Sequence, residues 1–363
     1  MQITILCKVV DNFGDIGVVY RLAKQLKKIN PENQINLVVD NLSSFQKICS
    51  SVDCHAERQE LEGLVVYDWN ADDFCHREFS RNDGELMPVI LECFQCGRPD
   101  WMERILFEEK LQRTVQIIMI DYLTAEKYAE DFHCLQSLTR SAKVQKVNFM
   151  PGFTEKTGGL VIDKEWCDLP EWKSDGPVLL FTYKREWGLL AEAVSDYCIN
   201  GKRKILVAQG RGKESIMQSM KKVSDCQNCV ELDYLDQSEW DRMMKDCSAL
   251  VIRGEESMSR ACLSGIPFIW HAYPQSDEYQ LVKVKALLER MRPHFEYDLF
   301  EIVEKAWLEI NSPDDVSCSY KGFFSCIPRL VPGFQDFARS LRKNGDLAAN
   351  LMTYIEKIAI IKK

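Results

Sequence analysis

The chain has 363 residues, which is long for one domain and ample for two. Hydrophobic residues make up 46% of it and charged residues 28%, as in ordinary globular proteins with a sizeable core. The net charge of -9 argues against a nucleic-acid partner, because phosphate backbones attract basic surfaces. No run approaches the ~18 apolar residues of a membrane span, and no signal sequence precedes the first apolar run. We therefore expect a cytoplasmic protein with no membrane partner.

An apolar run over Ile3–Val10 opens the chain and predicts a core strand of a parallel sheet. The loop that follows it reads Asp11, Asn12, Phe13, Gly14, Asp15, Ile16 and Gly17, and a helical pattern comes next. Ligands of open parallel sheets bind at the carboxyl ends of the strands, so Asp11 and Asp15 are candidate functional residues. Helix capping is the alternative for each of them. Two carboxylates in one tight turn repel each other, and together they indicate a site that receives a cation.

Short apolar runs alternate with helix-compatible stretches through both halves of the chain, which predicts βαβ units. Strands are expected at 35–39, 64–67, 89–94 and 115–120, and again at 178–181, 205–208, 230–232, 250–252 and 266–270. We expect Rossmann-like domains over residues 1–160 and 175–345, and a C-terminal helix over 346–363 that could pack back on the first domain. This α/β organisation suggests the GT-B architecture of nucleotide-sugar glycosyltransferases, in which two such domains face each other across a cleft.

The segment from Arg253 to Ser257 turns from a strand into a helix through Gly254. A helix N-terminus in that position offers backbone N–H groups and the positive end of the helix dipole to a diphosphate. Arg253 can neutralise phosphate, and Ser257 can add a hydroxyl donor. In the alternative, Glu256 and Ser257 simply begin the helix, and Arg253 is their ion-pair partner.

Aromatic and amide side chains near the ends of two predicted strands could bind a nucleotide base by stacking and hydrogen bonding. They are Phe181, Tyr183, Tyr234, Gln237 and Trp240. Taken singly, each aromatic residue is more often part of a core than of a binding site, so their shared placement carries the prediction.

The remaining chemistry-bearing residues show no metal or phosphate motif. The 15 cysteines are expected to be reduced, and the pairs Cys93/Cys96 and Cys226/Cys229 lie too far apart in sequence for one compact zinc module. The five histidines have no ligand spacing and are expected to be structural or exposed. Gly210–Lys213 lacks the spacing of a phosphate-binding loop and predicts a turn.

Several segments spread over both halves resemble the EarP family, the protein-arginine rhamnosyltransferases of bacterial elongation factor P. They are DNFGDIGV (11–18), IDYLTAE (120–126), PGFTEKTGGL (151–160), RGEES with SRA (253–261) and GIPFIWHAYPQ (265–275). Together these segments span nearly the whole chain, and jointly they are far more specific than any one of them.

The resemblance implies an inverting, metal-independent GT-B enzyme without a cofactor, which moves L-rhamnose from dTDP-β-L-rhamnose to one arginine of elongation factor P. It places the family's acidic pair on Asp11 and Asp15 and the acid of its nucleotide site on Glu255, and it implies that these three residues are catalytic. Its contacts to thymine and phosphate fall on Phe181, Tyr183, Gln237, Arg253, Glu256 and Ser257. The residue after Glu255 is often Asp in the family and is Glu here. Tyr234 and Trp240 lie where the family tends to have aromatic residues.

Asp15 is the first choice for the base and Asp11 for an orienting role, because carboxylates can bind a guanidinium and accept its proton. Two other functions stay open from the residues alone. One is a glycosyltransferase that uses another nucleotide sugar and a small or lipid-linked acceptor. The other is a nucleotide-binding regulator without catalytic activity.

Overall fold

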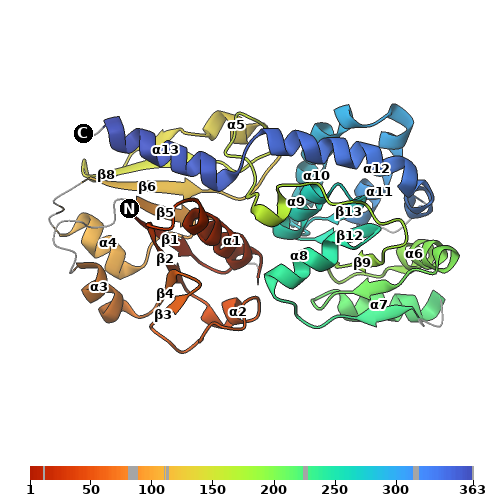
Figure 1. Ribbon diagram of the computed structural model, residues 1–363, viewed down its shortest axis with the longest axis horizontal. Coiled ribbons are helices and arrows are strands. Elements are labelled where there is room, and N and C mark those ends of the chain that lie inside the picture. The colour runs from red at the N-terminus through yellow and green to blue at the C-terminus, as the bar shows by residue number, and fades with distance from the viewer. Residues whose placement is uncertain are drawn as a thin grey trace. The chain divides into compact units, whose positions relative to one another are not determined.

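The computed structural model describes residues 1–10, 13–80, 89–109, 111, 114–223, 228–313 and 319–361 (Figure 1). The chain folds into two compact units. The first consists of Met1–Asp163 together with Asn344–Lys363, and the second of Lys164–Lys343. The first unit is therefore built from both ends of the chain, whereas the second is one continuous segment.

The first unit is an eight-stranded sheet with helices packed on it, counted over the described residues. Its strands are β1 (Gln2–Cys7), β2 (Gln34–Val39), β3 (Arg58–Leu61), β4 (Leu64–Asp68), β5 (Val89–Cys93), β6 (Val115–Ile120), β7 (Gln136–Ser137) and β8 (Val144–Phe149). Its helices are α1 (Gly14–Ile29), α2 (Leu42–Gln46), α3 (Asp72–Ser80), α4 (Asp100–Phe107), α5 (Tyr128–Phe132) and α13 (Leu347–Ile361). The strand order is β3-β4-β2-β1-β5-β6-β8-β7. Only the outermost strands, β3 and β7, pair antiparallel with their neighbours.

The first strand is shorter than the sequence predicts. β1 ends at Cys7, and Val10 is 76% exposed. The backbone N–H of Val9 donates to Asp40 Oδ1 at 2.8 Å, and that of Val10 donates to Asp15 Oδ2 at 2.7 Å. These side-chain acceptors replace the sheet partners, because every backbone N–H in such a segment needs an acceptor. β1 therefore ends three residues before the predicted end of the strand at Val10.

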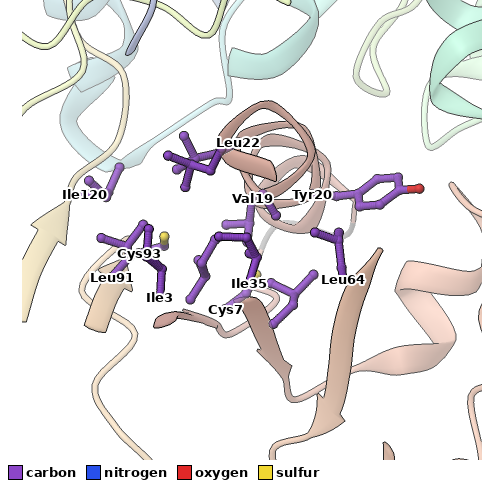
Figure 2. Packing of buried hydrophobic residues seen from close by; sticks show 14 of the residues in the cluster. Ile3, Cys7, Val19, Tyr20, Leu22, Ile35, Leu64, Leu91, Cys93 and Ile120 are labelled. Carbon is purple, nitrogen blue, oxygen red and sulfur yellow. The ribbon is translucent and has the colours of Figure 1, made fainter. Parts of the chain in front are cut away.

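The core of this unit lies between the sheet and α1, with residues of α1, β1, β2, β4, β5 and β6 interlocked as Figure 2 shows. Val19 and Leu22 of α1 are fully buried, as are Ile3 and Ile35 of the adjacent strands. α13 completes this core: Leu351 is fully buried in the same cluster, and the helix packs against α1. The helix α1, which carries Asp15 in its first turn, thus packs against both the sheet and α13.

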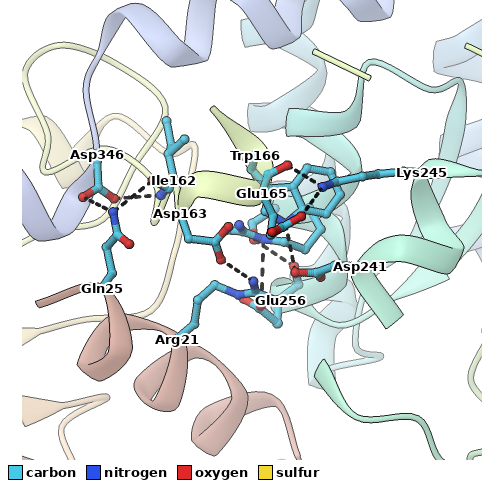
Figure 3. Close-up of polar contacts among 12 residues, drawn as sticks. Arg21, Gln25, Ile162, Asp163, Glu165, Trp166, Asp241, Lys245, Glu256 and Asp346 are labelled. Atoms are coloured by element: carbon cyan, nitrogen blue, oxygen red, sulfur yellow. Dashed lines mark hydrogen bonds and ion pairs between the residues drawn. The ribbon is translucent and has the colours of Figure 1, made fainter. Parts of the chain in front are cut away.

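The segment before the second unit and the segment after it are paired within the first unit. Leu347 donates its N–H to the carbonyl of Leu160 at 2.7 Å, and Ile162 donates to Asp346 Oδ1 at 2.7 Å. Figure 3 shows how α1 holds this pairing, with the Gln25 side chain directed at Asp346. The guanidinium of Arg21 also contacts the Asp163 carboxylate at 2.7 Å, and both side chains are largely buried.

The second unit has a five-stranded parallel sheet in the order β11-β10-β9-β12-β13, surrounded by helices. Its strands are β9 (Val178–Leu180), β10 (Ile205–Val207), β11 (Cys229–Glu231), β12 (Ala249–Arg253) and β13 (Phe268–His271). Its α-helices are α6 (Gly188–Gly201), α7 (Lys213–Val223), α8 (Gln237–Lys245), α9 (Glu255–Ser264), α10 (Tyr279–Met291), α11 (Tyr297–Asn311) and α12 (Ser319–Lys343). Each strand predicted in the second half is present, with ends shifted by one or two residues.

The cysteines of the described residues are free thiols, and most of them are buried. Cys226 lies outside those residues. None of the helices described is both long and apolar enough to pass through a membrane.

Candidate active site

Asp15 lies in the first turn of α1, at the carboxyl end of β1. It is 3% exposed, and its Oδ2 accepts the Val10 N–H. The residue that caps this helix is Phe13, which makes no side-chain capping bond, so Asp15 is not the N-cap. Its negative charge is favoured there by the positive end of the α1 dipole. The second acidic candidate, Asp11, and the neighbouring Asn12 lie outside the described residues.

The other loop residues give this turn its shape. Gly17 donates its N–H to the carbonyl of Phe13 at 2.9 Å, which closes the first turn, and Gly14 is its first helical residue. The Phe13 ring is half-buried, with Lys47 Nζ 5.6 Å from its centroid. Burial, followed by the nearby Cys93 thiol and the Asp15 carboxylate, raises the pKa of Cys7. Asp15 therefore sits beside protonated thiols, in a setting with little water to screen its charge.

Arg253 is the centre of the candidate donor site in the second unit. It ends β12, is 6% exposed, and its guanidinium carbon lies 4.4 Å from the ring centroid of Phe181 and 4.6 Å from that of Tyr183. The Phe181 ring in turn meets the edge of Trp240, with centroids 5.1 Å apart. Arg253 Nε is buried without a hydrogen-bond partner among the described residues. The structure thus brings together one predicted cation and three predicted aromatic side chains.

Tyr183 is less open than a stacking residue would need to be. Only 5% of it is exposed, and its ring packs edge-on against His271 and Tyr273. Phe181 and Trp240 are half-buried, and Tyr234, in the loop after β11, is 48% exposed. Gln237 begins α8 and lies three residues before Trp240, so both side chains project from one side of that helix. The three accessible aromatic residues, rather than Tyr183, are suited to a flat base.

The turn from Arg253 into α9 has an open N-terminus. Gly254 caps the helix with φ of 74° and provides no side-chain bond, and a Cβ at this glycine would meet no atom within 4 Å. The first N–H groups of α9 thus have no side-chain cap from Gly254, and Ser257, 8% exposed, lies in the same first turn.

The two acidic residues of this turn are paired with lysine and arginine from other positions. Glu255 Oε1 lies 3.2 Å from Lys283 Nζ, and Glu256 Oε1 lies 3.8 Å from Arg260 Nε. The helix-start part of the alternative agrees with the structure, since α9 begins at Glu255, whereas the ion pair found for Glu256 among the described residues is with Arg260 and not with Arg253.

Two features of this site were not predicted from the sequence. Gly210 lies in the turn before α7, and a Cβ there would come within 3.1 Å of Arg253 Nη2 and 3.2 Å of Phe181 Cε2. The predicted turn is confirmed, but it also forms a wall of the site. The second is His271 at the end of β13, which is only 4% exposed and contacts Tyr183 of the candidate donor site. Its position directly after the predicted strand 266–270 is the signal in the sequence that could have identified it.

Charge and burial keep His271 neutral. Burial, and then the positive charges of Arg185 and Arg253, lower the pKa of its imidazole to about 3. A cationic histidine beside two guanidinium groups would be strongly disfavoured. Within the described residues, no group of three or more His, Cys, Asp or Glu side chains is arranged to hold a metal ion.

Residues 3–356 match the family model for "Elongation-Factor P (EF-P) rhamnosyltransferase EarP". The chain belongs to this family. EarP relatives described as protein-arginine rhamnosyltransferases include one from Pseudomonas aeruginosa, 28% identical over 96% of this chain and 97% of the relative. Another, from Shewanella oneidensis, is 30% identical over 78% of this chain and 79% of the relative. The family resemblance read from the sequence is confirmed, and the chain is a glycosyltransferase that rhamnosylates an arginine of elongation factor P.

Solved structures confirm the GT-B fold. A structure described as the basis for EarP-mediated arginine glycosylation of EF-P is 18% identical, covers 98% of this chain and 99% of its own, and has a TM-score of 0.59. A UDP-glucose:anthocyanidin 3-O-glucosyltransferase in complex with UDP is 11% identical, covers 99% and 98%, and has a TM-score of 0.53. Both likenesses concern the fold.

Proposed function

We propose that this EarP protein takes L-rhamnose from dTDP-β-L-rhamnose, transfers it with inversion and without a metal ion, and works in the cytoplasm. The observation that carries the donor part is the buried Arg253, whose Nε has no partner among the described residues. A buried cation without an anionic partner is costly, and a diphosphate supplies the missing charge and acceptors. The open N-terminus of α9 beside it adds backbone donors.

The donor-site residues divide by chemistry. Phe181, Trp240 and Tyr234 offer ring faces for thymine, and Gln237 offers an amide to its edge. Arg253 and the Ser257 hydroxyl bind the diphosphate and stabilise it as it departs. Tyr183 packs against the guanidinium of Arg253, 4.6 Å from its ring centroid, rather than stacking on the base.

The paired acids of the same turn have a different role in the proposal. Glu255 and Glu256 are held by Lys283 and Arg260, so their charges are partly balanced before a ligand binds. Unpaired carboxylates beside a diphosphate would repel it. Because Glu255 and Glu256 are paired, we expect them to orient the sugar nucleotide without weakening its binding.

The acceptor arginine reacts through a nitrogen of its guanidinium, a group whose pKa exceeds ~12 and whose lone pair is delocalised. A new bond forms between that nitrogen and the anomeric carbon, while the bond from that carbon to the phosphate oxygen breaks and dTDP leaves with the electron pair. The nitrogen gives up one proton, and the Asp15 carboxylate accepts it. Asp11 is proposed to orient the guanidinium, and its placement lies outside the described residues.

The test replaces Asp15 with Asn, which keeps an oxygen for the Val10 N–H but removes the basic carboxylate. Turnover, measured as the mass shift of elongation factor P after incubation with dTDP-rhamnose, should fall by about 10² or more. Affinity for dTDP and the melting temperature should stay close to those of the unaltered protein. Asp131→Asn, an exposed change on α5 of the same unit, is the matched control and should retain full turnover. Near-normal modification by Asp15→Asn would remove Asp15 from the mechanism.

A further inference from the structure

His271 makes a hydrogen bond that links two parts of the donor site. Its Nδ1 lies 3.2 Å from the backbone nitrogen of Tyr183 and accepts that N–H. An imidazole nitrogen that accepts a hydrogen bond carries no proton, so in the neutral ring the proton is on Nε2. The ring is further fixed by edge-on contacts with Tyr183 and Trp187, whose centroids lie 5.2 Å and 5.1 Å away.

The backbone on either side of His271 is also anchored. Asn311 of α11 donates from Nδ2 to the carbonyl of Trp270 at 2.7 Å, and its Oδ1 accepts the N–H of Ala272 at 2.8 Å. Each of these groups is buried. The imidazole therefore projects from a rigid point of the fold and does not follow the movements of a loop.

The hydrogen bond spans the strand that carries Arg253. In the sheet order β9-β12-β13, Arg253 is paired in register with His271, and β9 leads into the segment with Phe181 and Tyr183. The bond from His271 to Tyr183 thus joins the two strands that flank β12, about 9–10 Å apart across two strand spacings. Arg253 lies between them, stacked on the two rings of that segment.

We propose that His271 is a positioning residue of the donor site: by accepting the Tyr183 N–H it fixes the segment after β9, and so holds the Phe181 and Tyr183 rings around Arg253. This inference rests on the proposed donor site. The imidazole works as a neutral acceptor, which the two nearby guanidinium groups favour, because a second proton on the ring would abolish the bond and repel both.

Two variants of His271 separate the effect of its hydrogen-bond acceptor from that of its ring packing. His271→Asn loses the ring but keeps an oxygen bonded to Cγ, where Nδ1 is bonded in histidine, so it can accept the same N–H. His271→Leu loses the ring and the acceptor together, and it leaves a buried N–H unpaired. Both variants lose similar ring contacts with Trp187, so a difference between them reports the hydrogen bond.

Titration calorimetry with dTDP and steady-state kinetics supply the readouts. His271→Leu should bind dTDP about tenfold more weakly, and the KM for dTDP-rhamnose should rise by a similar factor, the scale for a buried N–H left unpaired. His271→Asn should restore most of that affinity. The KM for elongation factor P should be unchanged in both. Equal affinity of the two variants for dTDP, or unaltered affinity of His271→Leu, would overturn the proposal.

The protonation of His271 in the unaltered protein tests the same hydrogen bond if neither variant folds. In ¹⁵N-histidine-labelled protein, His271 should show an unprotonated Nδ1 and a protonated Nε2 between pH 6 and 8. A protonated Nδ1 would overturn the role of His271 while leaving dTDP binding intact. Failure of the unaltered protein to bind dTDP is a different result, and it would overturn the proposed donor site together with this inference.

Discussion

Replacing Arg253 with Met should separate stability from donor binding. Methionine has a similar length and fills the space between Phe181 and Tyr183 without charge. The change removes a buried Nε that has no partner within the described residues, a relief of about 1–3 kcal/mol. It also removes two cation–π contacts at 4.4 Å and 4.6 Å, at a cost of about 0.5–2 kcal/mol each. These terms nearly cancel, so the unliganded melting temperature should change little.

Binding of dTDP should weaken by about 1.5–3 kcal/mol, or 10- to 150-fold, the scale for charge-assisted hydrogen bonds. At a dTDP concentration 100 times the Kd of the unaltered protein, the ligand stabilises it by about 2.7 kcal/mol. At the same concentration a 100-fold weaker variant gains only about 0.4 kcal/mol, so the thermal shift by dTDP should nearly vanish.

Arg203→Met is the matched control, because Arg203 also stacks on a ring, that of Tyr197 at 4.2 Å, and bonds the Ser174 carbonyl. It precedes β10, at the opposite end of the sheet from Arg253, so affinity for dTDP should be unaltered. If Arg253→Met melts many degrees lower and binds dTDP normally, Arg253 is a structural residue and has no part in donor binding.

Arg21→Met should lower the free energy of unfolding by about 3 kcal/mol in urea titrations, because the buried Asp163 carboxylate would lose its guanidinium partner at 2.7 Å. The double variant with Asp163→Asn should recover part of this loss. His271, with a folded pKa of about 3 against an ordinary 6.5, contributes stability that is fully present above pH 6.5 and lost as the pH falls toward 3. Between pH 7 and 5 that loss is about 2 kcal/mol, and His271→Asn should abolish it; an unchanged slope would contradict the assignment. Elongation factor P with Lys in place of its acceptor Arg should stay unmodified by mass spectrometry, because an ammonium carries its proton on the attacking nitrogen and cannot bind two carboxylate oxygens in a planar fork.

The sequence predicted the central strands well and the edges poorly. The strand at Val115–Ile120 is a continuous apolar run buried between neighbours, and its predicted ends are those of β6. β8 was not predicted, because Gln145, Lys146 and Asn148 interrupt its apolar pattern. It lies next to the short outer strand β7, so alternate side chains reach solvent and need not be apolar. The edge strand β3 was not predicted for the same reason, since most of its side chains are polar.

The donor site was predicted in its residue types but not in its pairings. The motif from Arg253 to Ser257 marks a strand-to-helix turn, which local sequence can reveal. Arg253 stacks on the Phe181 ring because β9 lies beside β12 in the sheet. About 70 residues separate these two strands in the chain, so local sequence does not reveal the contact. The same holds for His271, because its hydrogen-bond partner Tyr183 follows β9, which is distant from His271 in the sequence. Sheet order is a property of the whole fold, and periodicity along one segment does not encode it.

The division of the chain into units has a consequence for its synthesis. The first unit buries Leu351 and Ile355 of α13 in the same cluster as Val19 and Leu22 of α1, so its core lacks one wall until α13 has left the ribosome. Lys164–Lys343, by contrast, is complete before α13 has been made. Because domains fold as units during translation, the second unit should reach its native state first. The first unit, with Asp15 in the first turn of α1, is then completed after the second unit, although β1 and α1 are synthesised before it.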